Sequence, residues 1–143
     1  MAEPYNLQRF VDAQQGIIDV ALAELRAGQK QSHWMWFVFP QLAELGRSPT
    51  AKFYGIASFG EAKAYLDHPL LQTRLEDCLG TLLPWARRRS AEQIFSAIDA
   101  LKLRSSLTLF DYVQPSGPFS TGLDLFFAGC RDQLTLALLN PEG

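Results

Sequence analysis

The chain has 143 residues, of which 48% are apolar and 20% charged, and its net charge is −2. This size and composition indicate one globular domain that folds around its own core, and they exclude a small domain that depends on disulfides. The slightly negative charge provides no basic field of the kind that nucleic acid needs, so we expect no nucleic-acid partner.

The sequence also predicts a cytoplasmic location without membrane contact. Its longest apolar run, Trp34 to Pro40, is far shorter than the roughly 20 residues that a bilayer span needs. Charged residues from Glu3 onward interrupt any signal-peptide core. We therefore expect Cys78 and Cys130 to be free thiols. The two cysteines and two histidines have no paired spacing, so we predict no metal site, and no motif indicates a cofactor.

The first element that the periodicity predicts is a long helix. Apolar residues at three- and four-residue spacing run from Leu7 to Leu25, with Asn6 placed to cap the start and Gly28 to close the end. Gln14 lies in this apolar stripe, where a buried amide needs hydrogen-bond partners.

Capping signals predict the elements that follow. Ser-Pro pairs and Ser-x-x-Glu or Ser-x-x-Gln patterns are typical of helix starts, and Gly and Pro of helix ends. The predicted helical segments are, in order, 33–39, a turn at 41–45, 49–54, 59–66, a segment from Pro69 to before Pro84, 91–95, 97–113, 121–128 and 132–139. We expect an all-α fold without strands: a single compact globular domain, residues 1–143, of about seven to eight short, irregularly packed helices.

The densest aromatic content lies in residues 28–42. This stretch holds two of the three tryptophans, and a basic, polar flank precedes them. Because aromatic side chains bury the most apolar area each, we expect a core around Trp34, Trp36, Phe37 and Phe110.

These motifs resemble a bacterial family of small all-helical proteins of unknown function that genome annotation often labels "calpastatin". The resemblance depends mainly on Lys30 with SHWMWFVFPQL at 32–42 and on LKLRSSLTLF at 101–110, with shorter matches at 7–14, 54–56 and 61–69. It implies a compact all-α fold and no established activity. A calpain inhibitor is a disordered polar chain that folds on its target, whereas this sequence has an aromatic core and repeated helix caps.

The first candidate site is His33 with Lys30, Ser32 and Gln41. A histidine beside large aromatics can act as a general base, or it can bind a ligand whose ring stacks on Trp34 or Trp36. The alternative is structural: the histidine supports a helix start while the tryptophans fill the core.

The second candidate site is the cluster of Lys102 and Arg104 with the hydroxyl-bearing residues Ser105, Ser106 and Thr108. Positive charge beside hydroxyl groups can hold a phosphate or a carboxylate. Alternatively, Arg104 pairs with Asp111 or with a neighbouring helix, and the hydroxyls bond to carbonyls one turn earlier.

Three other features of the sequence are weaker indications of a site. Gln14 either lines a pocket or ties two helices together, and it would strengthen the ligand hypothesis if it converged with His33 and Arg104. The run Arg87–Arg89 is either a solvated turn or a contact for an acidic partner. Cys130 follows a glycine near a helix start, but no neighbouring histidine or aspartate supports a nucleophile.

No pattern specifies a reaction, so whether the protein is an enzyme stays open. The favoured hypothesis is binding of a small anionic, ring-bearing ligand such as a nucleotide by Gln14, Lys30, His33, Trp34, Gln41, Lys102, Arg104 and Ser105. The alternative is a protein-interaction module in which these motif residues only organise the fold, and which exposes a contiguous apolar patch.

Overall fold

The computed structural model describes residues 5–140, and regular structure in that range is helical apart from a single bridge between Leu42 and Ile56. The α-helices are α1 (Gln8–Gln14), α2 (Ile18–Arg26), α3 (Met35–Val38), α4 (Pro49–Phe53), α5 (Phe59–Asp67), α6 (Pro69–Leu82), α7 (Ala91–Phe95), α8 (Ala97–Val113), α9 (Pro118–Phe127) and α10 (Gln133–Leu139). Two 3-10 turns, η1 (Ala43–Leu45) and η2 (Leu83–Arg87), lie between them. The all-α prediction is confirmed, with more and shorter helices than the seven or eight expected.

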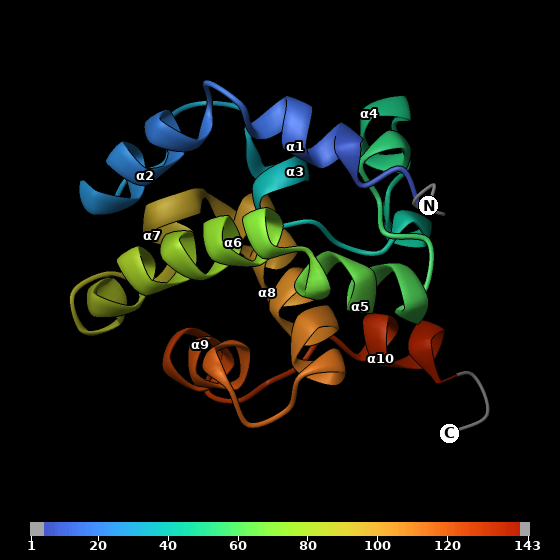
Figure 1. The fold of residues 1–143 in the computed structure, drawn as a ribbon. Helices are drawn as coiled ribbons and strands as arrows, with labels where there is room; N and C mark the ends of the chain where they lie inside the picture. The colour runs from blue at the N-terminus through green and yellow to red at the C-terminus, as the bar shows by residue number, and fades with distance from the viewer. Residues whose placement is uncertain (1–4, 141–143) are drawn as a thin grey trace.

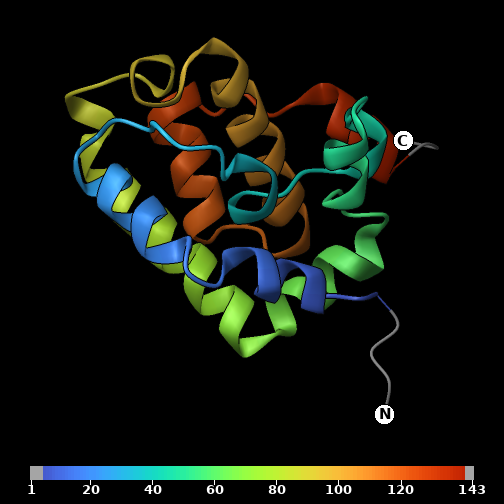
Figure 2. The ribbon, with the colours of Figure 1, turned by 90° about the horizontal axis from the view of Figure 1, so that it is seen from above.

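Helices α6 and α8 form the centre of the fold. Every residue of α8 from Ser105 to Asp111 is buried, because α5, α7, α9 and α10 all pack against this helix. Helix α6 contacts α2, α5 and α9, and Figure 1 shows it crossing the middle, with α1 to α3 above it and α9 and α10 below. Viewed from above, α2 runs along α6 (Figure 2). Within the described range, no helix is long and apolar enough to cross a membrane.

The long first helix predicted from the apolar stripe is wrong: the chain breaks it into α1 and α2. Gly16, at φ +80°, turns the backbone between them, a conformation that glycine adopts without steric cost. The predicted cap is also wrong. Asn6 has φ +51° and does not cap α1, whose N-cap position is Leu7.

The serine caps behave as the sequence predicts. The hydroxyl of each accepts a hydrogen bond from the backbone amide three residues later, which satisfies one of the free donors of a helix start; the four are Ser48, Ser58, Ser90 and Ser96. At Ser90 the box is complete, since the Gln93 side chain accepts from the Ser90 amide.

At Ser58 the capping box is only half formed, because Glu61 has a different partner. Its carboxylate accepts from the Ala57 amide at 2.7 Å and lies 2.9 Å from the Arg9 guanidinium. Arg9 also donates to the carbonyls of Phe53 and Gly55. This nearly buried ion pair ties α1 to the connection between α4 and α5.

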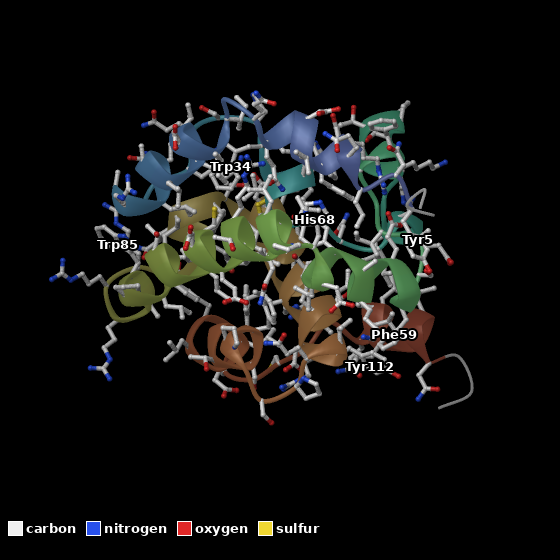
Figure 3. All side chains as sticks on the ribbon, in the orientation of Figure 1. Tyr5, Trp34, Phe59, His68, Trp85 and Tyr112 are labelled. Atoms are coloured by element: carbon white, nitrogen blue, oxygen red, sulfur yellow. The ribbon has the colours of Figure 1, made fainter. Side chains whose placement is uncertain are left out.

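The aromatic core is confirmed in part. Trp34 and Phe110 are fully buried, whereas Trp36 and Phe37 are half-buried at its edge. The Trp34 ring packs edge-on against Phe95, and Figure 3 places it between α2 and α3.

Gly28 closes α2 in the predicted way. At φ +69° it donates its amide to the Leu25 carbonyl, while the Gln29 amide reaches the Glu24 carbonyl, the two bonds of a Schellman motif. A Cβ at Gly28 would lie 2.7 Å from the Trp85 ring, so both conformation and space require glycine here.

The two glycines that bound α2 provide a matched test. Gly16→Ala introduces only the strain of a positive φ, because nothing lies within 4 Å of its Cβ, and we expect a loss of about 1 kcal/mol. Gly28→Ala adds the clash with Trp85, and we expect about 3 kcal/mol. Urea denaturation of both variants measures the difference, and equal losses would contradict the close approach of Trp85.

Candidate functional site

The loop that carries the aromatic motif is held in place by one carboxylate, that of Glu24 near the end of α2. It accepts hydrogen bonds from the amides of Gln31 and Ser32, from the Ser32 hydroxyl, and from the Trp34 indole at 2.9 Å. Four donors on one side chain fix the loop against α2 and orient Trp34 into the core.

These hydrogen bonds set the ionisation of Glu24. Partial burial raises the pKa of the carboxyl group, but the bonds from Ser32, Gln31 and Trp34 favour the charged form and together lower the pKa to about 2. Glu24 is therefore a carboxylate over the whole neutral range.

Two lysines share a second carboxylate beneath the same loop. The Lys30 ammonium lies 2.9 Å from Asp99, and the Lys102 ammonium lies 3.2 Å from it. The side chains of all three are largely buried, at 7%, 20% and 17% exposed for Lys30, Lys102 and Asp99. Two positive charges thus face one negative charge, and the group carries an excess of one positive charge.

Trp36 covers this group from the loop side. The Lys102 ammonium lies 3.7 Å from the centroid of the Trp36 ring, a close cation–π contact. Trp36 itself is half-buried. Three residues earlier in the loop, His33 is exposed and forms no polar contact with any described residue.

Arg104 lies in a different place from Lys102. The two residues flank buried Leu103 on opposite sides of α8, and Arg104 faces α10, with its guanidinium 3.8 Å from Asp132. The Thr108 hydroxyl donates to the Arg104 carbonyl at 2.7 Å and accepts from the Asp132 amide. For Arg104 and Thr108 the structural alternative is thus the arrangement observed, with Asp132 rather than Asp111 as the partner, whereas the buried Ser106 hydroxyl has no hydrogen-bond partner among the described residues.

Asp111 instead pairs with Arg131 at 3.0 Å. Ser105 is buried on α8, and Gln41 is half-buried, with its backbone carbonyl accepting from the Ile56 amide.

Gln14 ties helices together on the α6 side of the fold. Its amide nitrogen donates to the Phe37 carbonyl at 2.7 Å and contacts the Tyr65 hydroxyl at 3.0 Å, while Arg74 donates to its oxygen. Burial raises the pKa of Tyr65 far above its ordinary value, so the phenol stays protonated. No contact joins Gln14, His33 and Arg104, so the convergence that would have strengthened the ligand hypothesis is not observed.

The structure therefore divides the predicted residues. Lys30, Trp34 and Lys102 gather beneath the loop, whereas Gln14 and Arg104 serve other junctions. Glu24 and Asp99, which organise the loop, were missed. Asp99 stands three residues before Lys102, a spacing typical of helix ion pairs, but nothing near Glu24 in the sequence indicates its role.

Two observations bear on what could bind at the predicted residues: the positions of the surface hollows and the placement of metal-binding side chains. Five hollows on the described surface have volumes of about 180 to 470 Å³, and none of these five is lined by His33, Trp34 or Arg104. Among residues 5–140, no group of three or more His, Cys, Asp or Glu side chains is placed to hold a metal ion.

A family model described as protein of unknown function DUF1810 matches residues 4–139. The chain belongs to the DUF1810 family. The conserved hypothetical protein Rv1873 from Mycobacterium tuberculosis, whose crystal structure is known, is 48% identical to this DUF1810 chain; the match covers 96% of this chain and 98% of that one with a TM-score of 0.92. The comparison with curated proteins gives no match. None of these findings bears on the "calpastatin" label, or on ligand binding by this DUF1810 protein.

The bonds to Glu24 predict a specific acid sensitivity. Because the folded-state pKa is about 2 and the ordinary value is 4.5, the stabilisation is present above about pH 4.5 and is lost as the pH falls toward 2. We expect Glu24→Gln to cost about 2 kcal/mol at pH 7 and to flatten the decline of the melting temperature in that window. Thermal melts from pH 7 to pH 2 measure this.

Glu44→Gln is the matched control, since Glu44 is exposed and forms no ion pair or side-chain hydrogen bond with a described residue. A Glu24→Gln protein with the same acid profile as Glu44→Gln would contradict the assignment.

Proposed function

We propose that this protein binds a small anionic, ring-bearing ligand, such as a nucleotide, at the surface formed by His33, Trp36 and Lys102. The observation that carries the proposal is the excess positive charge beside a partly exposed indole: Lys30 and Lys102 share Asp99, and Lys102 contacts Trp36. An anionic group at Lys102 would complete the charge balance of a partly dehydrated cluster.

Of the two tryptophans that could stack on the ligand ring, Trp36 is the accessible one. Trp34 is fully buried, and its indole N–H is bonded to Glu24, so its role is to position the loop. Trp36 retains accessible surface, and the exposed His33 lies three residues before it in the sequence. Arg104 pairs with Asp132 on the other side of α8, and the proposed surface does not include it.

A thermal-shift screen against AMP, ADP, ATP, NAD, sugar phosphates and aromatic carboxylates tests the proposal. A ligand present at about 100 times its dissociation constant adds about 2.7 kcal/mol, which raises the melting temperature by several degrees in a domain of this size. We expect Lys102→Met to abolish the shift and His33→Ala to reduce it.

Lys63→Met is the matched control, because Lys63 is an exposed lysine that also pairs with an aspartate in its own helix. A shift that survives Lys102→Met would place the ligand elsewhere. A folded wild-type protein that responds to none of the probes would count against the proposed function.

A second candidate is a protein-interaction module, and helix α10 favours it. Five of its seven residues are leucine or alanine, yet Thr135 is its only fully buried member, and Leu134 is 59% exposed. Beside this helix, Phe59 and Tyr112 stack edge-on at 5.8 Å and are 43% and 37% exposed (Figure 3). A second copy of the chain would bury this apolar surface.

Sedimentation velocity over a range of protein concentrations tests this candidate. We expect a concentration-dependent dimer that Leu134→Lys abolishes, because a charge at the centre of an apolar contact is costly to dehydrate. Val20→Lys, on α2 at the far side of the molecule (Figure 1), is the control. A monomer at every concentration would rule out self-association.

A further inference from the structure

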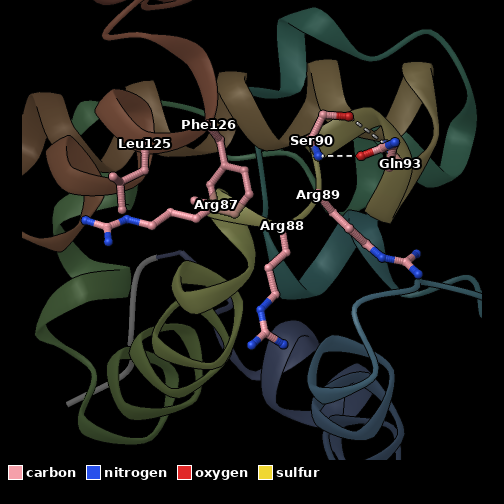
Figure 4. Close-up of a pocket in the computed structure, with 8 residues that line it drawn as sticks. Arg87, Arg88, Arg89, Ser90, Gln93, Leu125 and Phe126 are labelled. Atoms are coloured by element: carbon pink, nitrogen blue, oxygen red, sulfur yellow. Dashed lines mark hydrogen bonds between the residues drawn. The ribbon is translucent and has the colours of Figure 1, made fainter.

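Three consecutive arginines border a hollow between η2 and α9. The hollow has a volume of about 350 Å³ and is lined by Arg87, Arg88, Arg89, Ser90, Gln93, Leu125, Phe126 and Ala86. All three arginines are exposed. Figure 4 shows Arg87 extended along Leu125 and Phe126, with Arg88 and Arg89 pointing in two other directions.

The positive charge at this hollow is not compensated. Of the basic side chains, Arg9, Lys30, Lys63, Lys102, Arg104 and Arg131 each lie within ion-pair distance of a carboxylate. None of the three arginines at the hollow has a carboxylate partner among the described residues. Three adjacent free cations are a marked local departure in a chain whose net charge is −2.

The turn that presents these arginines is rigid. The amides of Arg88 and Arg89 both donate to the Trp85 carbonyl at 2.8 Å, and their guanidinium groups lie 5.9 and 5.8 Å from the Trp85 ring. Arg89 also donates to the Gly28 carbonyl at 3.4 Å. Such anchoring lowers the entropy lost when a partner binds.

We propose that this hollow docks an acidic peptide segment of a partner protein, with carboxylates spaced along it and one apolar side chain that inserts against Leu125 and Phe126. The three guanidinium groups fan apart (Figure 4), an arrangement that suits an extended segment better than a single phosphate. Leu125 is 46% exposed and supplies an apolar wall next to the charge. This inference is independent of the surface at Trp36.

A peptide fits the hollow better than a nucleic acid does. The overall negative charge opposes the approach of a long polyanion. Single strands also bind through a series of aromatic rings on which successive bases stack, whereas the lining of this hollow holds one aromatic ring, that of Phe126.

Isothermal titration calorimetry with a short synthetic peptide of glutamates around a central leucine tests the inference. We expect binding that weakens as salt is raised, and that Arg87→Glu weakens by about tenfold or more. We also expect weaker binding when the central leucine of the peptide is replaced by glutamine, because Leu125 and Phe126 then lose their apolar contact.

Arg47→Glu is the matched control, since it makes the same charge change at an exposed arginine just before α4. Binding lost equally in Arg87→Glu and Arg47→Glu would reduce the effect to net charge and overturn the inference. So would tighter binding of a single-stranded oligonucleotide, which would indicate a nucleic-acid partner instead. No binding of the peptide to the folded wild-type protein at moderate salt would overturn it as well.

Discussion

The arrangement of the loop after α2 depends on the Glu24 carboxylate. Its four hydrogen bonds pull the amides of Gln31 and Ser32 and the indole of Trp34 onto one point. A charged acceptor surrounded by donors is stronger than neutral hydrogen bonds, and it is also directional, so it selects one loop conformation. Without this constraint the largest side chain of the core, that of Trp34, would have no fixed entry into the space between α2 and Phe95 of α7.

That loop conformation determines the electrostatics beneath it. The Lys30 amide donates to the Ile94 carbonyl of α7, and its ammonium is thereby directed to Asp99 on the first turn of α8. Lys102 reaches the same carboxylate from one turn further along. At its other end the loop begins at Gly28, which packs against Trp85 beside the arginine-lined hollow. One short segment thus connects both charged surfaces of the molecule.

Local signals in the sequence were sufficient to predict most helix starts. A serine cap bonds to the backbone amide three residues later, so the whole interaction lies within one turn of the chain. Such signals failed where tertiary contacts decide. Asn6 is not the cap of α1, and Gly16 divides an apolar stripe that resumes at Ile17 beyond Gln14. The partners of Arg104 and Lys30 lie 28 and 69 residues away, at Asp132 and Asp99, and no periodicity encodes such distances. For the same reason, residue type was sufficient to select candidate residues. It could not show that Gln14, Lys102 and Arg104 have different partners in different parts of the fold.

The two tryptophans of the aromatic motif have different roles: Trp34 belongs to the core, whereas Trp36 belongs to the proposed binding surface. Trp34 is fully accounted for by the core, since its ring is buried and its N–H is bonded to Glu24. Trp36 is only half-buried, and its ring contacts the Lys102 ammonium. A half-dehydrated lysine that shares its carboxylate with a second lysine costs electrostatic free energy, because neither charge is fully neutralised. Core packing does not require that arrangement, and an anionic ligand at the Trp36 surface would offset its cost.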